Sequence, residues 1–511
     1  MKSGILLITL ALLLLISSCG QEKREATLLD SMPAGYDIYI TFNPSEIDAA
    51  AILSDFREIA FDNGQQLPEP VAGILGFDPF EWDEWVGALA LDPDREIGLV
   101  IAMGEFEPEL ITLFLPSTDA DKLREFVGYL YPRIPEMEAL TRIIESDGYV
   151  IFAAAQAQSF LDEFEASLET LVGTEDDFSS LRELSNGGTP AAEVFIGAAI
   201  LEEEGFGSLL ISCLSVESTL TLQFITRIHD IEGLEYAAAV SRKTSGNSMR
   251  VPADATAAIH VSIDMAMIKE MVSTGLPQDA QTGAAIMGFD SIDDILDIFS
   301  GDVWFALQTD GYSYSGMIAF GMNDAGALRS LIGKLTGLMD MSGEEYDSFE
   351  FQGNTCFSVD VVGLAGLASI EAGIVADAFV LSGGYTLQDV ADGVSFDEYL
   401  ERTGLDIADD GGFALAADIG ALAAAYDLNS EAGNIIDLEE FGFVSMSGSS
   451  NEDIYEFNVS VDFGSGDPFS TLTGVFAALA STDSGMMIEE PVQDDPPPVE
   501  KDQSVDDRDG T

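Results

Sequence analysis

Histidine, cysteine and basic side chains are scarce in this chain. Its 511 residues include 2 His, 3 Cys and 20 Lys plus Arg, against 91 Asp plus Glu, which gives a formal net charge of -71. A field of this sign repels nucleic acid and anionic lipid head groups, and it attracts cations and basic partners. The composition therefore argues against nucleic acid as a partner. It indicates a solvated acidic surface with only diffuse binding of cations.

Catalytic and metal-binding patterns are also missing. With His229 and His260 as its only histidines, the chain has few ligands for a zinc site and little scope for histidine catalysis. The nearest approach to a calcium loop, DIADDGG at 406–412, has the wrong spacing. No G-x-S-x-G, H-E-x-x-H, P-loop or dinucleotide fingerprint occurs, and no carboxylate pair stands out among the 91 acids. The sequence singles out no catalytic residue, metal ligand or cofactor, so we expect a protein that is not an enzyme.

The N-terminal apolar run, Ile5–Ile16, is too short to cross a membrane. As a helix it covers about 18 Å of a hydrocarbon core that is about 30 Å thick. Lys2 precedes it and small residues follow, which is the pattern of a secretory signal. No later stretch reaches the length of a membrane span, so we expect no other transmembrane segment.

Residues 16–19, Ile-Ser-Ser-Cys, resemble the lipobox of bacterial lipoproteins. The resemblance implies cleavage before Cys19, thioether attachment of diacylglycerol to its thiol, and acylation of the new amino terminus. Two or three acyl chains give stable membrane anchoring. An ordinary cleaved signal with an incidental cysteine and an uncleaved anchor are the alternatives. We expect residues 1–18 to be a lipoprotein signal peptide and residues 19–32 to be a tether.

The residue after this cysteine bears on which membrane holds the anchor. Gly20 stands where the inner-membrane retention signal of enteric bacteria has aspartate. By analogy we expect an outer-membrane location in the cell envelope. Whether the folded part faces the periplasm or the exterior stays open.

Similar blocks of sequence occur twice, in the same order. MPAGYDIYITFNPSEI (32–47) is followed about 220 residues later by VPADATAAIHVSIDMAMI (251–268). Further matching blocks are ILGFD (74–78) with IMGFD (286–290), DKLREFVGYL (121–130) with GALRSLIGKL (326–335), DGYVIFAAA (147–155) with DAFVLSGGY (377–385), and EEEGFGS (202–208) with LEEFGFVS (438–445). We predict two tandem copies of one unit, at 33–240 and 251–480. Residues 482–511 are acidic and proline-rich, and we expect a disordered tail.

Hydrophobic periodicity predicts the elements of each copy. Residues 38–42 and 259–263 alternate between apolar and more polar side chains, with His260 on the polar side. Residues 455–463 alternate most strictly, with Tyr, Phe, Val, Val and Phe separated by Glu, Asn, Ser and Asp. Residues 123–130 and their counterparts 328–335 instead have helical spacing. These patterns predict an α+β fold in which each copy is a largely antiparallel sheet with one wet face, covered on the other by amphipathic helices.

The opening of each copy, PAGYDIYITF and PADATAAIHV, resembles a group of bacterial secreted proteins and lipoproteins of unknown function. The units of that group begin with a PADA-like strand. The resemblance implies an extracytoplasmic location, and it carries no catalytic residues to transfer.

Several conspicuous side chains have a structural and a functional interpretation. Trp82, Trp85, Val86 and Leu89 lie at helical spacing and would suit a stacking platform for sugar or peptide. The aligned stretch of the second copy is mostly aliphatic, so we predict that they form a core. GYSYSG at 311–316 is expected to be a hairpin loop.

Two cysteines remain beyond Cys19. Cys213 and Cys356 fall in apolar, strand-like stretches at non-equivalent positions of the two copies. A disulfide between them is permitted outside the cytoplasm but requires their Cα atoms to lie within about 7 Å of each other. We expect buried free thiols, with the disulfide as the alternative.

Two hypotheses of function follow. The first is a membrane-anchored, non-enzymatic lipoprotein whose paired modules bind an envelope protein or polymer, or support the envelope structurally. The alternative is a hydrolase of an envelope polymer, or a carrier of lipid or another ligand, that uses carboxylates in a cleft between the copies.

Overall fold

The computed structural model describes most of the chain between Thr27 and Gly464. The described residues are 19–20, 27–44, 49–50, 53–54, 57, 77–78, 80–104, 107–130, 137–185, 189–201, 206–216, 218–228, 249–266, 268–270, 288–309, 313–342, 346–360, 369–403, 412–426, 441–451, 454–464, 468 and 471. The predicted signal peptide, the predicted tail and His229 lie outside them.

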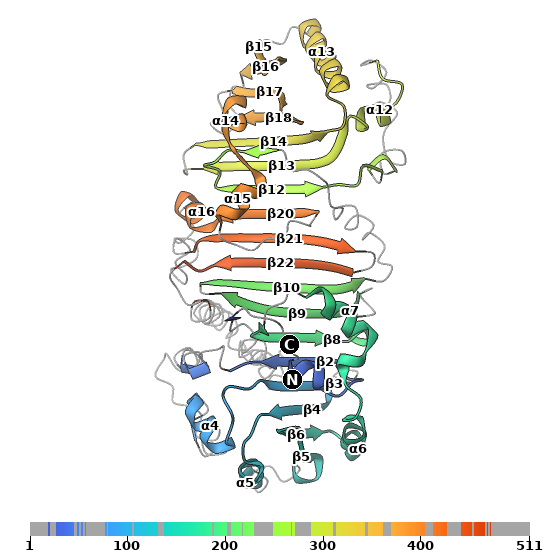
Figure 1. Cartoon of the computed structure of the whole chain (residues 1–511), viewed down its shortest axis with the longest axis vertical. Helices are drawn as coiled ribbons and strands as arrows, with labels where there is room; N and C mark the ends of the chain where they lie inside the picture. Colours follow the sequence, from blue (N-terminus) through green and yellow to red (C-terminus); the bar gives the residue numbers. More distant parts are fainter. Residues whose placement is uncertain are drawn as a thin grey trace, which may run out of the picture.

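One antiparallel sheet of 18 strands runs through the described chain. Figure 1 shows its strands stacked along the long axis of the molecule. The N-terminal half contributes, in spatial order, β5 (Thr141–Ser146), β6 (Tyr149–Ala155), β4 (Pro108–Leu115), β3 (Ile97–Met103), β2 (Ile38–Phe42), β8 (Ala192–Ile196), β9 (Phe206–Val216) and β10 (Thr219–Ile228).

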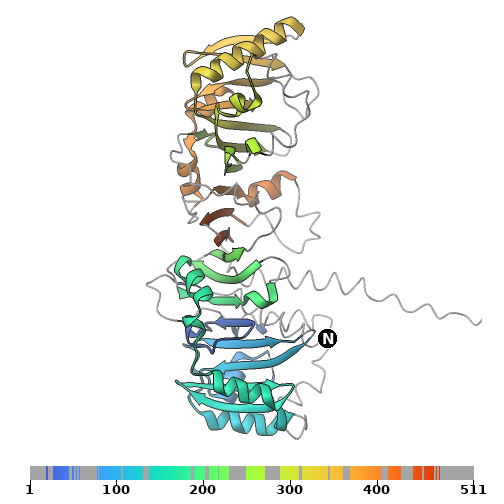
Figure 2. The ribbon, with the colours of Figure 1, turned by 90° about the vertical axis from the view of Figure 1, so that its right-hand side faces the viewer.

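The C-terminal half continues the same sheet. Its strands, in spatial order, are β22 (Ile454–Asp462), β21 (Phe443–Asn451), β20 (Phe413–Asp418), β12 (Ala257–Ser262), β13 (Phe299–Thr309), β14 (Tyr314–Met322), β18 (Ala378–Gly383), β17 (Ser369–Val375), β16 (Asn354–Asp360) and β15 (Asp347–Phe351). The two halves meet where β10 pairs with β22 over nine residue pairs, from Thr219–Asp462 to Arg227–Ile454. Figure 2 shows the resulting elongated body from the side.

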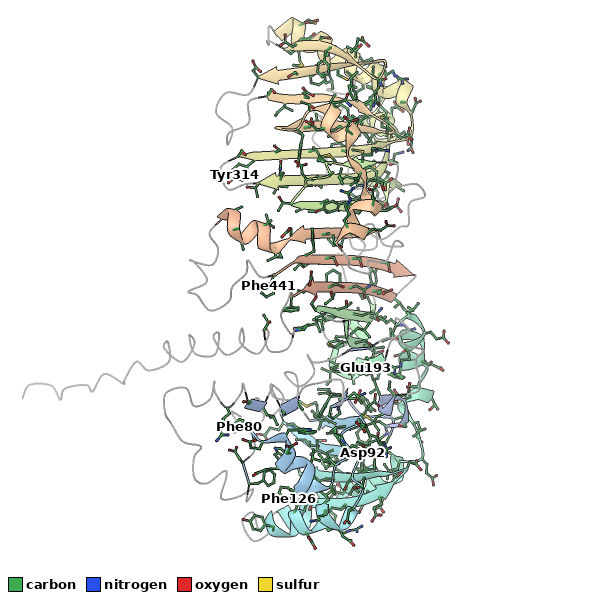
Figure 3. All side chains as sticks on the ribbon, turned by 60° about the vertical axis from the view of Figure 1, so that its left-hand side comes forward. Phe80, Asp92, Phe126, Glu193, Tyr314 and Phe441 are labelled. Carbon is green, nitrogen blue, oxygen red and sulfur yellow. The ribbon has the colours of Figure 1, made fainter. Side chains whose placement is uncertain are left out.

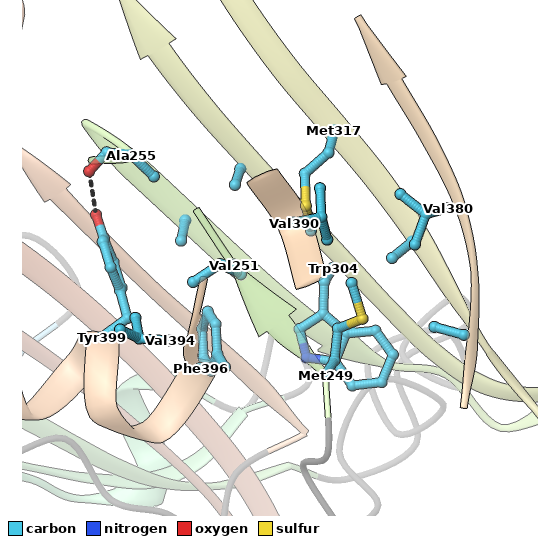
Figure 4. Close-up of a cluster of buried hydrophobic side chains, with 14 of the residues drawn as sticks. Met249, Val251, Ala255, Trp304, Met317, Val380, Val390, Val394, Phe396 and Tyr399 are labelled. Atoms are coloured by element: carbon cyan, nitrogen blue, oxygen red, sulfur yellow. Dashed lines mark hydrogen bonds between the residues drawn. The ribbon is translucent and has the colours of Figure 1, made fainter. Parts of the chain in front are cut away.

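One surface of the sheet bears both Tyr39 and His260 and is here called the Tyr39 face. Helices cover it in both halves. In the N-terminal half, α6 (Gln158–Ser167), α7 (Asp176–Leu184) and the 3-10 turn η1 (Leu28–Ser31) pack on it. In the C-terminal half, α14 (Leu387–Asp392) and α15 (Phe396–Arg402) do the same around Trp304. Figure 4 shows this second cluster, in which the Tyr399 hydroxyl donates to the Ala255 carbonyl at 3.2 Å.

The opposite surface, here called the Ile40 face, is covered by other helices near the two ends of the sheet. Over the N-terminal half these are α4 (Trp82–Leu89) and α5 (Ala120–Leu130). Near the far end of the C-terminal half they are α12 (Ile292–Leu296) and α13 (Ala325–Ser342). The helices predicted at 123–130 and 328–335 are confirmed, because Leu123 and Val127 of α5 and Leu328 and Ile332 of α13 are buried against the sheet.

Short elements complete the fold. They are β1 (Cys19–Gly20) paired with β7 (Thr189–Pro190), β11 (Arg250–Val251) paired with β19 (Val394–Ser395), the helices α8 (Ala198–Leu201) and α16 (Ile419–Tyr426), and the 3-10 turns η2 (Met137–Leu140) and η3 (Val172–Thr174). Within the part of the chain that the structure describes, no helix is long and apolar enough to cross a membrane.

The expected antiparallel sheet with helices is confirmed. The expectation that the polar side of these strands faces water is wrong. In β22 the polar Asn458 and Ser460 are 7% and 2% exposed, whereas Phe457 is 39% exposed. In β12 the same inversion buries His260 and Ser262 and leaves Ile259 half-buried. The reason is that alternation decides which side chains share a face, whereas the packing of other segments decides which face is covered.

The segment just before the first strand also differs from expectation. Residues 27–32 were assigned to the tether, yet Leu28, Leu29 and Met32 are buried in the N-terminal core. Their apolar side chains fill the space between β3 and η3. Any free tether therefore ends before Thr27.

Candidate functional site

A row of buried polar side chains crosses the junction of the two halves on the Tyr39 face. The strand register places Glu193, Ser212, Gln223, Asn458 and Ser447 directly side by side on β8, β9, β10, β22 and β21. All five are at most 7% exposed. We call these five residues the polar row. The row joins residues from distant parts of the sequence, since Gln223 and Asn458 become neighbours only through the β10–β22 pairing.

Hydrogen bonds satisfy most of this row at the junction. Gln223 Nε2 donates to Glu456 Oε1 at 2.7 Å, and Asn458 Nδ2 donates to the same oxygen at 2.9 Å. One register step away, the hydroxyls of Thr221 and Ser460 lie 2.7 Å apart. The Oδ1 atom of Asn458 is buried without a partner among the described residues. The junction is thus held by specific polar contacts as well as by backbone pairing.

An ion cluster closes the N-terminal end of the polar row. The Arg182 guanidinium, on α7, forms an ion pair with Glu193 and reaches Asp30 at 3.3 Å and Thr27 Oγ1 at 2.6 Å. Ser212 Oγ donates to Glu193 Oε1 at 3.1 Å. Figure 3 labels Glu193 within the stack of strands. Because Glu193 is 1% exposed, its charge depends on these partners, and the cluster fixes η1 to the sheet.

Glu96 lies beside this cluster, immediately before β3. Its Oε2 atom accepts a hydrogen bond from the backbone N–H of Leu28. Burial raises the pKa of Glu96 to about 7, and the nearby charges of Glu193 and Asp30 add to the increase. The pKa of Glu96 is thus higher in the folded protein than in the unfolded chain, where it is about 4.5. Glu96 therefore contributes most to the free energy of unfolding below pH 4.5, and this contribution is lost as the pH rises through 7.

Replacing Glu96 with glutamine should therefore remove a pH dependence. Between pH 5 and 8 the wild-type free energy of unfolding should fall by on the order of 2 kcal/mol more than that of Glu96→Gln, which should be the more stable protein at pH 8. Urea unfolding at four pH values measures both. The exposed Glu107→Gln is the control and should follow the wild type. Parallel pH profiles for wild type and Glu96→Gln would show that Glu96 does not titrate in this range.

Further along the Tyr39 face, two strands beyond Ser447, His260 is another buried polar residue. Its ring stacks on Trp304 with centroids 4.9 Å apart and meets Phe396 edge-on. Its Nε2 atom lies 3.2 Å from Asp302 Oδ1, and Ser300 Oγ donates to Asp302 Oδ2 at 2.9 Å. The serine contacts the aspartate rather than the histidine, so the set lacks the nucleophile-to-base contact of hydrolytic triads. Packing explains the position of His260.

Several sequence expectations can be compared with this structure. Leu89 of α4 is buried in the apolar core that contains Leu123, and Trp82, Trp85 and Val86 of the same helix pack against this core, as predicted. Cys213 on β9 and Cys356 on β16 are buried and are not joined by a disulfide, as predicted. The backbone of Cys19 pairs with Pro190 in the β1–β7 ribbon, and its side chain lies outside the described atoms.

Other expectations fit in part. The loop predicted at 311–316 does join two strands, although β14 already begins at Tyr314. The proposed carboxylate chemistry required a cleft between the copies, whereas the halves meet through a strand pair. Within the described ranges, no group of three or more His, Cys, Asp or Glu side chains is placed to hold a metal ion.

The apolar residues of the Ile40 face were not recognised from sequence as a surface feature. Phe305, Leu307 and Phe457 are 41%, 37% and 39% exposed on β13 and β22. The strict alternation in 455–463 was the available signal, but it predicts that the apolar side chains of this strand face the core. In the central strands, the buried face therefore carries the charged and polar side chains, and the partly exposed face carries large apolar side chains.

Comparisons with known proteins give no family. No family model matches the chain, and no curated protein matches it. Three solved structures show a slight likeness: crystal forms III, I and IV of TP0453, at 8%, 8% and 10% identity and TM-scores of 0.24, 0.23 and 0.22. They cover 44%, 41% and 40% of this chain and 90%, 81% and 87% of their own. At such scores the likeness assigns neither a fold nor a function to this chain.

Proposed function

We propose that this chain is a lipid-anchored lipoprotein of the cell envelope that acts by binding or structural support rather than by catalysis. Cys19 is the proposed site of lipid attachment, and the outer membrane is the favoured location. The lipobox-like residues 16–19 and the short apolar run before them support the anchor. The resemblance to secreted proteins with PADA-like strands supports the same location.

We also propose that the chain contains two tandem copies of one unit. The spatial order β5-β6-β4-β3-β2-β8-β9-β10 in the N-terminal half corresponds to β17-β18-β14-β13-β12-β20-β21-β22 in the other. The matched sequence blocks fall on corresponding elements, β2 with β12, α5 with α13 and β6 with β18. The β15–β16 hairpin is then an addition to the second copy.

The edge-to-edge junction is the observation that favours a binding or supporting role. Strand β10 ends one half and β22 ends the other, so their pairing makes one long body with its interior filled by side chains. An elongated body built on one continuous sheet presents two similar surfaces side by side (Figure 1). A repetitive or two-fold envelope partner would meet both surfaces at high effective concentration.

The anchor is tested by replacing Cys19 with serine in the producing cell. The wild type should incorporate labelled fatty acid and sediment with membranes, whereas Cys19→Ser should lose the label, because serine cannot form the thioether. Density-gradient separation of the two membranes then tests the outer-membrane location. Cys213→Ala, which alters a buried thiol, is the control and should stay labelled. An unlabelled wild type, or a labelled Cys19→Ser protein, would refute the proposal.

A further inference from the structure

An apolar strip that none of the described helices covers crosses the middle of the Ile40 face. The strand register aligns six apolar side chains across six adjacent strands, β22, β21, β20, β12, β13 and β14. They are Val459, Met446, Leu415, Ile259, Phe305 and Ile318. At about 4.8 Å per strand the row is about 24 Å wide. We call these residues, with Leu307 and Phe457 beside them, the central strip.

The side chains of the central strip are not part of the packed cores. Among the described residues, none of the eight belongs to a buried apolar cluster. Three of the six large apolar side chains that are most exposed in the described chain, Phe305, Leu307 and Phe457, lie on it. A contiguous apolar patch of this kind usually marks an interaction surface.

The chemistry of the strip favours a hydrocarbon partner. Along the described parts of these six strands, no Asp, Glu, Lys or Arg projects from the Ile40 face. The opposite face of the same strands carries Glu456, Asp462, Asp418 and Asp302. Protein interfaces combine an apolar centre with a polar rim and regular hydrogen bonds. Acyl chains require neither, so a charge-free strip in a chain of net charge -71 suits them better.

The position of the proposed anchor brings the strip close to lipid. β1, which contains Cys19, pairs with β7, and β7 leads into β8. Strand β8 lies three strands from β22, a distance of about 14 Å. Acyl chains attached at Cys19 would therefore hold the bilayer within reach of the strip.

We infer that the central strip rests on the hydrocarbon of a lipid bilayer surface and adds a second membrane contact to the anchor. The inference rests on the proposed lipid anchoring only for the nearness of the bilayer. Because the chain is strongly acidic, it should prefer zwitterionic to anionic lipid, and added salt should reduce this preference.

The test uses the chain from residue 19 onward with Cys19→Ser, so that neither the apolar run 5–16 nor an acyl chain contributes. It should co-sediment with phosphatidylcholine vesicles, and less with vesicles that also contain phosphatidylglycerol. Phe305→Asp with Phe457→Asp should weaken partitioning by roughly tenfold or more, because two large apolar contacts are replaced by charges. Tyr129→Asp is the matched control, since Tyr129 is also aromatic and 39% exposed but lies on α5. It should bind like the parent protein.

A second measurement does not depend on the doubly charged variant folding. Phe305→Cys labelled with a polarity-sensitive dye should shift to the blue on phosphatidylcholine vesicles, whereas the same dye at Tyr129→Cys should not. Three results would overturn the inference: no vesicle binding by the parent, equal binding by the double variant and the control, or a lipid-free doubling of mass that Phe305→Asp with Phe457→Asp abolishes. The last result would assign the strip to a second copy of the chain. The labelling experiment at Cys19 is independent of all three.

Discussion

Replacing Arg182 with methionine is expected to lower the free energy of unfolding by about 3 to 5 kcal/mol. The substitution removes the guanidinium that faces the carboxylate of Glu193, which is 1% exposed and also accepts hydrogen bonds from the hydroxyl groups of Ser212 and Thr27. Methionine keeps most of the apolar stem of Arg182, so the loss reports the missing guanidinium rather than a cavity. Urea or thermal unfolding of the full chain measures it.

Two further variants isolate the charge effect. Arg142→Met removes a guanidinium from an exposed pair with Asp162 and should cost less than about 1 kcal/mol. Adding Glu193→Gln to Arg182→Met should recover much of the lost stability, because it removes the unpaired buried charge. If Arg142→Met and Arg182→Met cost the same, the cluster around Glu193 contributes no more than a surface ion pair does.

A disulfide placed across the junction should form readily and stabilise the protein strongly. Thr221 and Ser460 are directly opposite on β10 and β22, with their hydroxyl oxygens 2.7 Å apart. The double variant Thr221→Cys with Ser460→Cys would close a loop of more than 200 residues, for which the chain-entropy relation gives about 5 kcal/mol less any strain. Altered gel mobility without reductant and the shift in unfolding midpoint with and without reductant measure it.

The native thiols require a control in this experiment. Cys213 lies on β9, beside Leu214, which pairs with Thr221, so Cys213→Ala should be included to prevent mispairing. Thr221→Cys with Ser449→Cys serves as the mismatched pair, because Ser449 is opposite Glu456 rather than Thr221. Failure of the matched pair to crosslink under oxidising conditions would mean that the two halves do not share one sheet as described.

Parts of this architecture were accessible from sequence because they depend on local patterns. The spacing of Leu123, Val127, Leu328 and Ile332 is that of an apolar helical stripe, and the structure buries these residues on α5 and α13. Alternation in 455–463 marks an antiparallel strand. Such patterns are set by the 3.6 and 2.0 residue periods of helix and strand, so they can be read without knowing any tertiary contact.

The candidate sites were less accessible. Thr27 lies 155 residues before Arg182, and these two residues meet Glu193 only after α7, β8 and the segment before β2 have packed together. Nothing marks Glu193 among 91 acids until its burial is known. The central strip was hidden for the opposite reason, because a strand with an apolar side is ordinarily expected to turn that side toward the core.

The sequence by itself determined the strands and helices whose periodicity is clear, the scarcity of histidine and basic groups, and which side chains of those strands share a face. The tertiary structure decided that β10 and β22 pair, that residues 27–32 belong to the core, and that the polar side of the central strands is the buried one. The physical reason is that a strand's period assigns its side chains to two faces but carries no information on what covers either. That depends on contacts between residues hundreds of positions apart, such as Gln223 and Glu456.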